Sequence, residues 1–196
     1  MRHWVDMVMG ASAIGISLVS LFVALEDGGA MKRLVQANSW PFVAAEFSTL
    51  GPDGTPHFRM MLTNKGVGPA KIETLEVFVS GKPVAGPRAL MAAMIGPEGL
   101  NHDHKFGTSD IVGSVLSARE SVDYLITLPE TFTPEQNAAL RNAGPRVNTR
   151  VCYCSVFDEC WTRGGPDGDA RAKPVDRCEM PKTRYENGSY GLVGGK

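Results

Sequence analysis

The stretch HFRMMLTNKGVGPAKIETLEVFVS, residues 57–80, carries the pattern that decides the fold of this chain. Apolar side chains occupy every second position near both of its ends: Phe58, Met60 and Leu62, then Leu75, Val77 and Val79. A period of two places such side chains on one face of a β-strand. The glycines and the proline between the two runs predict a loop that cannot extend either strand. The stretch therefore predicts two strands joined by a loop.

The loop, residues 64–70, has the form Asn-x-Gly-x-Gly-Pro-Ala, which is common between strands of immunoglobulin-like sandwiches. A glycine-rich loop can also bind phosphate when it opens a helix. This loop lies between strands and lacks the Lys-Ser/Thr pair of a P-loop. We interpret it as structural.

Outward from this stretch, short β-branched or aromatic runs alternate with turn residues, consistent with 22 glycines and 13 prolines in 196 residues. Further strands are predicted at residues 40–50, 110–118, 121–129, 146–157 and 160–164, with a last strand that ends at Cys178. Residues 40–50 and 57–64 should form a hairpin, and a second hairpin should turn at Arg119 and Glu120. The predicted fold class is mainly β, an immunoglobulin-like antiparallel β-sandwich.

Two short surface helices complete the predicted body. Residues 88–96 favour a helix that packs across one end of the sandwich. The second helix should begin after Thr133, the N-cap residue, which forms a capping box with Gln136. Pro134 occupies its first helical position, and Gly144 with Pro145 ends it.

A transmembrane helix is predicted to begin at Met7 and end at Leu25. These 19 residues carry no charged side chain, and at about 1.5 Å per residue they cross roughly the 30 Å core of a bilayer. We expect a break at Gly28 and Gly29, followed by a helix at the membrane surface. A cleaved signal peptide, with processing near Gly28 and Ala30, is the alternative.

The predicted domains are residues 1–38, the transmembrane helix and juxtamembrane segment; 39–184, the β-sandwich; and 185–196, a flexible tail. Flanking Lys and Arg residues do not favour a cytoplasmic amino terminus. We nevertheless expect an extracytoplasmic body for two reasons. A short tail commonly stays inside while the large soluble domain is exported, and export would explain the clustered cysteines.

Charge and helix composition limit the partners. The net charge is −1 and the 20 Lys and Arg residues form no basic block, so nucleic acid is excluded as a partner. Within the span, Ala11 with Gly15 and Ala13 with Ser17 would allow a protein partner to approach through the helix. Ordinary small residues facing lipid are the alternative.

The four cysteines all lie in the last quarter of the chain, at Cys152, Cys154, Cys160 and Cys178. On a strand, Cys152 and Cys154 point to the same face. Four cysteines allow three pairings, and the sequence does not choose among them. Disulfides are favoured over a metal; the alternative is a Cu(I) site at Cys152 and Cys154, because soft Cu(I) accepts thiolates.

No catalytic residues are predicted. His57, His102 and His104 are available as bases, but no motif links them to a cysteine nucleophile. The trio His102-Asp103-His104 resembles a ligand set and is interpreted as solvated. We therefore expect a membrane-anchored, non-enzymatic binding or scaffold protein without a cofactor, with a thiol-dependent enzyme as a further alternative.

Two resemblances accompany these patterns. The segments NSWPF, NKGVGPAKI and VCYCSVFDECW are similar to a group of uncharacterised bacterial single-pass membrane proteins with a β-sandwich domain, which implies a bacterial inner membrane. Cys152-Tyr153-Cys154 resembles the Cys-aromatic-Cys strand of copper-delivery proteins of cytochrome c oxidase assembly. That second resemblance implies copper bound by Cys152 and Cys154.

Overall fold

The structure is a computed structural model that describes residues 2–51, 54–97 and 105–186. It divides into two units, residues 1–38 and residues 39–196, and each is considered by itself. The first unit is a helix, and the second, here called the body, is a two-sheet antiparallel β-sandwich with short helices. The predicted mainly β fold class is confirmed.

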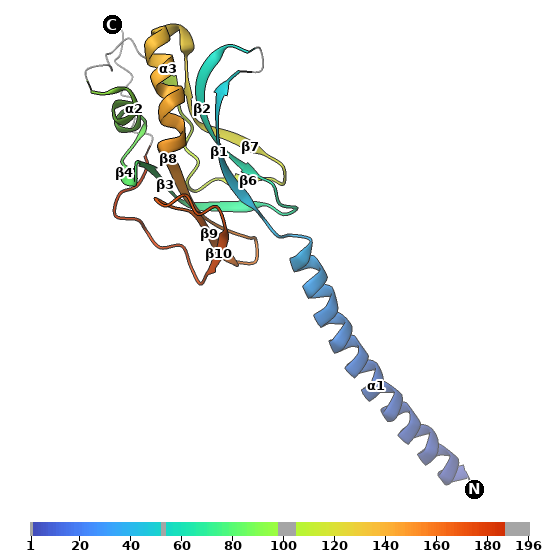
Figure 1. The fold of residues 1–196 in the computed structure, drawn as a ribbon. Helices are drawn as coiled ribbons and strands as arrows, with labels where there is room; N and C mark the ends of the chain where they lie inside the picture. Colours follow the sequence, from blue (N-terminus) through green and yellow to red (C-terminus); the bar gives the residue numbers. More distant parts are fainter. Residues whose placement is uncertain (1, 52–53, 98–104, 187–196) are drawn as a thin grey trace, which may run out of the picture. The chain divides into compact units, whose positions relative to one another are not determined.

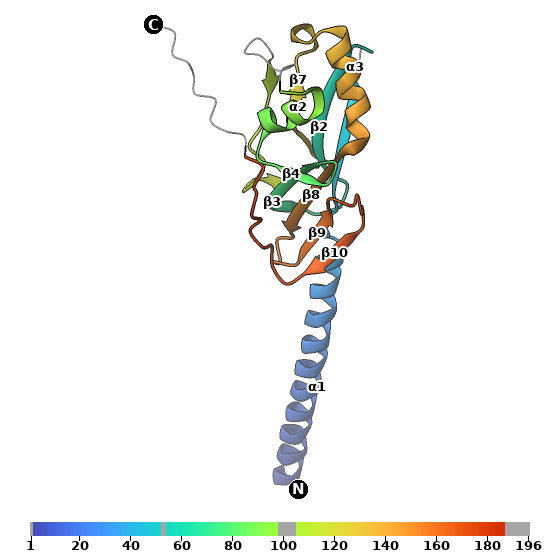
Figure 2. The same cartoon turned by 60° about the vertical axis from the view of Figure 1, so that its left-hand side comes forward.

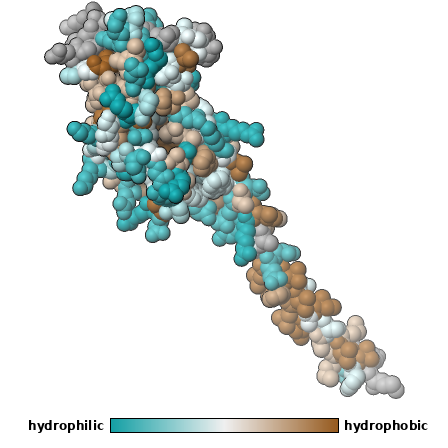
Figure 3. All heavy atoms as spheres, viewed as in Figure 1, coloured by the Kyte–Doolittle hydropathy of each residue, from teal (hydrophilic) through white to brown (hydrophobic). Residues whose placement is uncertain are grey.

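The first unit is α1, Arg2–Ala37, the one helix of the described chain that is long and apolar enough to cross a membrane. Its 36 residues correspond to about 54 Å of helix. Figure 3 shows mainly hydrophobic side chains on its visible face, whereas the visible face of the body is mostly hydrophilic. The predicted break at Gly28 and Gly29 is wrong: the helix continues through both, because a glycine costs a helix only about 1 kcal/mol.

The body begins at Ser39 and contains two sheets (Figure 1). Sheet A has the strand order β1-β2-β7-β5, and sheet B has the order β10-β9-β8-β3-β4, with β6 also paired to β3. The strand bounds in sheet A are β1, Val43–Leu50; β2, Pro56–Asn64; β7, Ser121–Thr127; and β5, Phe106–Gly107. In sheet B they are β10, Ala172–Val175; β9, Cys160–Gly164; β8, Val147–Cys154; β3, Ala70–Val79; β4, Lys82–Val84; and β6, Val115–Leu116.

The predicted hairpin of β1 and β2 is confirmed, with Val43 opposite Asn64 and Phe47 opposite Met60. The loop after Asn64 carries the chain from sheet A to sheet B, so β2 and β3 lie in different sheets. Their alternating apolar residues face each other across the core, which satisfies both patterns at once.

The predicted hairpin at Arg119 and Glu120 is wrong. Val115 pairs with Lys71 of β3, whereas β7 pairs with β2 and β5. The chain changes sheets between the two strands, and backbone hydrogen bonds with Asn64 hold the crossing: the Arg119 N–H donates to the Asn64 carbonyl, and the Asn64 N–H donates to the Glu120 carbonyl. Long-range pairing to β3 therefore replaced the local pairing that the short turn indicated.

Two α-helices pack together on the body, α2, Pro87–Ile95, and α3, Pro134–Ala143 (Figures 1 and 2). α2 buries Leu90, Met91 and Met94 in the core. The predicted capping box of α3 is present: the Gln136 N–H donates to Thr133 Oγ1 at 3.2 Å, and the Thr133 N–H donates to Gln136 Oε1 at 2.8 Å. Short 3₁₀ turns, Pro129–Thr131 and Gly144–Arg146, flank α3.

The core extends beyond the predicted domain boundary at residue 184. Tyr185 is 4% exposed and lies edge-on to Tyr124, with ring centroids 5.8 Å apart. Its N–H donates to the Leu75 carbonyl, and the Glu186 N–H donates to the Ala85 carbonyl. Residues 185 and 186 therefore belong to the body; the remainder of the predicted tail lies outside the described residues.

Candidate functional site

All four cysteines meet on the outer face of sheet B, where β8 and β9 form a hairpin. Cys152 is joined to Cys178 and Cys154 to Cys160, with sulfur–sulfur distances of 2.03 and 2.05 Å. Cys154 lies opposite Cys160 in the hairpin register, which explains that pairing. The same-face prediction for Cys152 and Cys154 places both sulfurs beside Cys178. The Cys152–Cys178 disulfide links the hairpin to a segment 26 positions from Cys152.

That distant segment, residues 176–186, is called the strap. It follows β10 and contains no helix or strand. Two attachments fix it to the body, the Cys152–Cys178 disulfide near its start and the buried Tyr185 ring near its end. A segment without regular structure gains its order from such attachments, because each limits the conformations of the chain between them.

A groove of about 1130 Å³ lies between the strap and sheet B. Its floor comes from β3, β8 and β9, and one wall is β10. The principal lining residues are Thr74, Glu76, Arg150, Cys152, Thr162, Lys173, Asp176, Arg177, Glu179, Lys182 and Thr183. Side chains of both charge signs line the groove, so it suits a polar ligand with both donors and acceptors.

Ion pairs hold the groove lining in place. Arg150 Nη1 lies 3.0 Å from Glu76 Oε2, and the Arg150 guanidinium also covers the Phe78 ring at 5.3 Å. At the start of β10, Arg171 and Lys173 both pair with Asp169. The hydrogen bonds from these two cations lower the pKa of the Asp169 carboxyl well below its usual range.

A smaller cavity of about 380 Å³ lies where the strap enters the core. It is lined by Leu75, Ile111 and Tyr124 together with the strap residues Met180 and Tyr185. Burial raises the pKa of the Tyr124 hydroxyl, which lies 2.9 Å from Thr149 Oγ1. Tyr124 thus joins the two sheets beneath the strap.

Asn64, the last residue of β2, is the main buried polar residue near the start of β3, where the chain enters the body. Its side chain is fully buried and makes five hydrogen bonds. The amide nitrogen donates to the carbonyls of Gly68, Leu116 and Ser117, and the oxygen accepts from the N–H groups of Phe42 and Gly66. The structural interpretation of the loop is supported, but the sequence did not reveal this role for Asn64; only the placement of an asparagine at a strand end hinted at it.

The two loop glycines are required by close backbone approach. A Cβ at Gly68 would lie 2.0 Å from the Ser39 carbonyl oxygen, and one at Gly66 would lie 2.4 Å from the Phe42 nitrogen. The first residues of the body therefore run directly over the loop. Trp40 beside them contacts Phe42 and Trp161 through its ring.

The other predicted site residues are not brought to the cysteines. His57 lies in β2, and its buried Nε2 has no hydrogen-bond partner among the described residues. The trio His102-Asp103-His104 lies outside the described residues. Three sulfurs, those of Cys154, Cys160 and Cys178, lie within 4.8 Å of one another. All three belong to disulfides, so they could hold a metal only after the disulfides are reduced. Copper at Cys152 and Cys154 stays a prediction, since Cu(I) binds the thiolate rather than the disulfide.

The small residues of α1 are also placed. The Ser17 hydroxyl donates to the Ala13 carbonyl at 2.8 Å, so it is satisfied within α1 and leaves a compact surface at this pair.

Comparison with protein-family models, with curated proteins and with solved structures found no match. The site therefore has to be interpreted from its own geometry.

Proposed function

We propose that this protein is a membrane-anchored, non-enzymatic binding or scaffold protein whose β-sandwich holds a polypeptide ligand in the groove beneath the strap. The groove is the observation that carries the proposal. Pockets for small molecules are mostly apolar with a few placed polar groups. The present groove is instead lined by many polar and charged groups of both signs, which suits the backbone and mixed side chains of a polypeptide.

We place the body on the extracytoplasmic side of a bacterial inner membrane, with α1 as the single span. The pairing of all four cysteines supports this orientation, because structural disulfides persist in oxidising compartments and are rare in the cytosol. α1 supplies the length and apolar composition that an anchor needs.

Ligand contact is tested by photo-crosslinking from the groove. A benzoylphenylalanine at Lys173, which lines the groove, should crosslink to a polypeptide in native membranes, whereas the same probe at exposed Arg141 on α3 should not. The double variant Arg177→Glu with Lys182→Glu should reduce the Lys173 crosslink, while Arg141→Glu with Arg146→Glu should leave it unchanged. Equal crosslinking from both positions would contradict the groove as the binding site.

Orientation is tested separately with a membrane-impermeant thiol reagent. On intact cells with a permeable outer membrane, the cysteines should become labelled only after a reductant is added. Labelling that requires disruption of the inner membrane would place the body in the cytoplasm and contradict the extracytoplasmic assignment.

A further inference from the structure

Among the strands at the ends of the two sheets in the described chain, β1 is the one long strand without a proline. The other edges are β4, β5, β6 and β10. β5 and β6 have two residues each, while β4 and β10 contain Pro83 and Pro174. A short strand or a proline prevents another chain from continuing the ladder. β1 has eight residues and neither protection.

The register of β1 identifies which of its backbone groups face outward. The Lys65 N–H donates to the Phe42 carbonyl at 2.7 Å. In an antiparallel pair, every second residue of a strand forms hydrogen bonds with its neighbour. Counting from Phe42, the residues of β1 that bond to β2 are therefore Ala44 and Glu46. Val43, Ala45 and Phe47 therefore direct their N–H and C=O groups away from β2. The Val43 carbonyl accepts from Arg163 Nη1 at 3.1 Å, which confirms this direction.

The outward groups of Ala45 and Phe47 remain available. Among the described residues, neither has a further hydrogen-bond partner for its N–H or C=O. An extended chain beside β1 would make up to four backbone hydrogen bonds with these two residues, the arrangement used when a peptide adds a strand to a sheet edge.

The side chain of Phe47 is only partly covered at this edge. Its ring stacks on buried Phe58 with centroids 6.4 Å apart, so it points toward the core side of sheet A. It nevertheless remains 45% exposed because no strand lies beyond β1. A slot of about 200 Å³ opens beside it, lined among others by Ala45, Met60, Val147 and Val151. One or two apolar side chains of an added strand would enter this slot and cover Phe47.

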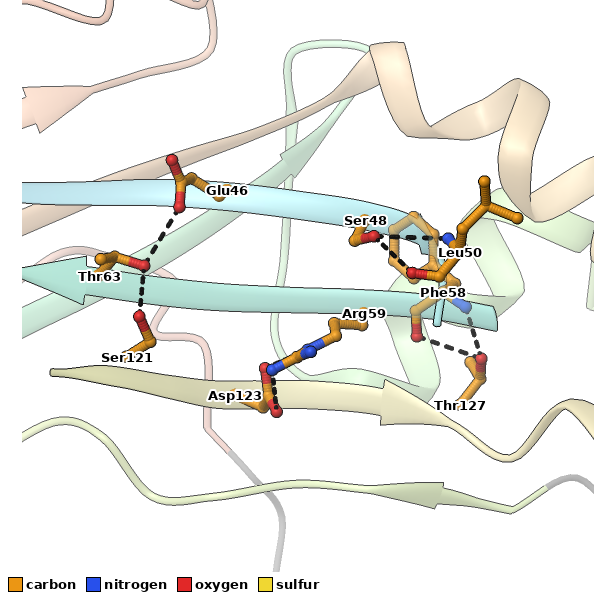
Figure 4. Close-up of polar contacts among 9 residues, drawn as sticks. All are labelled: Glu46, Ser48, Leu50, Phe58, Arg59, Thr63, Ser121, Asp123 and Thr127. Carbon is orange, nitrogen blue, oxygen red and sulfur yellow. Dashed lines mark hydrogen bonds and ion pairs between the residues drawn. The ribbon is translucent and has the colours of Figure 1, made fainter. Parts of the chain in front are cut away.

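The opposite face of β1 is polar and held by contacts across the sheet (Figure 4). Thr63 Oγ1 lies 3.1 Å from Glu46 Oε2 and 2.9 Å from Ser121 Oγ, which connects β1, β2 and β7. Glu46 also pairs with Lys65. A strand added to β1 would thus present alternating apolar and polar side chains, with a basic side chain favoured opposite Glu46.

We propose that β1 accepts an amphipathic β-strand from a partner protein, through the backbone of Ala45 and Phe47 and a basic residue opposite Glu46. A second copy of this chain is a poorer occupant. Antiparallel self-pairing that uses Ala45 and Phe47 of both copies would place Glu46 directly opposite Glu46, and like charges in that position repel. The surface is separate from the groove, so it goes beyond the proposed function.

The test uses the peptide acetyl-TVKVT-amide, fluorescently labelled, and the full chain in detergent micelles. When its lysine faces Glu46, its two valines lie opposite Ala45 and Phe47. We expect saturable binding in fluorescence anisotropy. N-methylation of one valine nitrogen removes one donor toward β1 and should weaken binding about ten-fold, the factor for one hydrogen bond of about 1.4 kcal/mol. N-methylation of the lysine nitrogen, which faces away, is the matched control and should change binding little.

Two protein variants complete the test. Ala45→Pro removes an outward N–H that β2 does not use, and it should weaken binding while circular dichroism remains that of a β protein. Exchange of lysine for glutamate in the peptide should weaken binding about three-fold, and Glu46→Lys should restore it. If Ala45→Pro does not fold, the comparison of N-methylated peptides still decides.

Absence of binding at millimolar peptide, or equal effects of N-methylation at valine and lysine, would overturn the proposal. A dimer of the chain that dissociates on Ala45→Pro would assign the edge to a second copy and would overturn it as well. Loss of the Lys173 crosslink from the groove has no bearing on these measurements, so the two proposals fail independently.

Discussion

The sulfur of Cys154 lies 3.9 Å from the sulfur of Cys178, although the two belong to different disulfides. A thiolate attacks a disulfide sulfur within such reach and displaces the other sulfur. A free Cys154 would therefore form a bond to Cys178, break the Cys152–Cys178 bond and release Cys152 as a thiolate. The strap would then be attached two residues further along β8.

The variant Cys160→Ser tests this relationship because it leaves Cys154 without its partner. We expect a mixture of Cys152–Cys178 and Cys154–Cys178 disulfides, measured by mass spectrometry of non-reduced peptides after alkylation at low pH. The double variant Cys154→Ser with Cys160→Ser serves as the control and should contain only Cys152–Cys178. A single variant that shows only this bond and an alkylated Cys154 would contradict the prediction.

Asn64→Ala should be among the most destabilising polar substitutions in the body. It removes five hydrogen bonds and leaves buried backbone groups without partners, so we expect a loss of about 3 to 5 kcal/mol in the free energy of unfolding. Urea unfolding of the full chain in detergent micelles, followed by tryptophan fluorescence, measures the change. Asn148→Ala is the control, because Asn148 is half-buried and donates to Pro166 at 3.3 Å, and it should cost less than about 1 kcal/mol.

Tyr185→Ala should release the carboxyl end of the strap. Truncation of a buried aromatic ring costs about 3 to 5 kcal/mol, and here it also removes an attachment of the strap. We expect trypsin to cleave after Lys182 and Arg184 faster than in the unchanged protein, as followed by mass spectrometry. The exposed Met180 provides the comparison: Met180→Ala should leave the cleavage rate unchanged. Equal rates for both variants would show that Tyr185 does not hold the strap.

Glu46 should contribute a pH-dependent share of stability. Its hydrogen bond from Lys65, aided by Thr63, lowers the pKa of the carboxyl below its ordinary value of 4.5, against the opposing effect of partial burial. A lowered folded-state pKa stabilises the fold above the unfolded-state value, and this contribution is lost as the pH falls through the folded-state value. Glu46→Gln should therefore cost about 0.2 to 1 kcal/mol at pH 7 and little near pH 3, measured by urea unfolding at both pH values. The same loss at both pH values would contradict an ionic origin.

Much of the body could be predicted from local pattern. The alternation in residues 57–80 predicted β2 and β3, and the signals at Thr133 and Gln136 predicted α3, because each depends on neighbours in sequence. The predictions at Arg119 and at Gly28 failed for different reasons. Long-range pairing to β3 and the helix propensity of a long apolar run outweighed a local turn or break signal.

The candidate sites divide in the same way. Four cysteines in one quarter of the chain and an alternating β8 predicted a sulfur cluster, but not that Cys178 would reach Cys152. The groove, the strap and the open edge of β1 carry no local signature, because each is formed by segments far apart in sequence.

The sequence by itself therefore determined the long apolar helix, the β class of the body and the face to which Cys152 and Cys154 point. These follow from periodicity and composition, which act over a few residues. Only the tertiary structure decided the sheet order, the disulfide partners, the burial of Tyr185 and the exposure of Phe47. Those features depend on which distant strands pair and on the absence of a strand paired to the outer side of β1. Both are determined by the packing of the whole core.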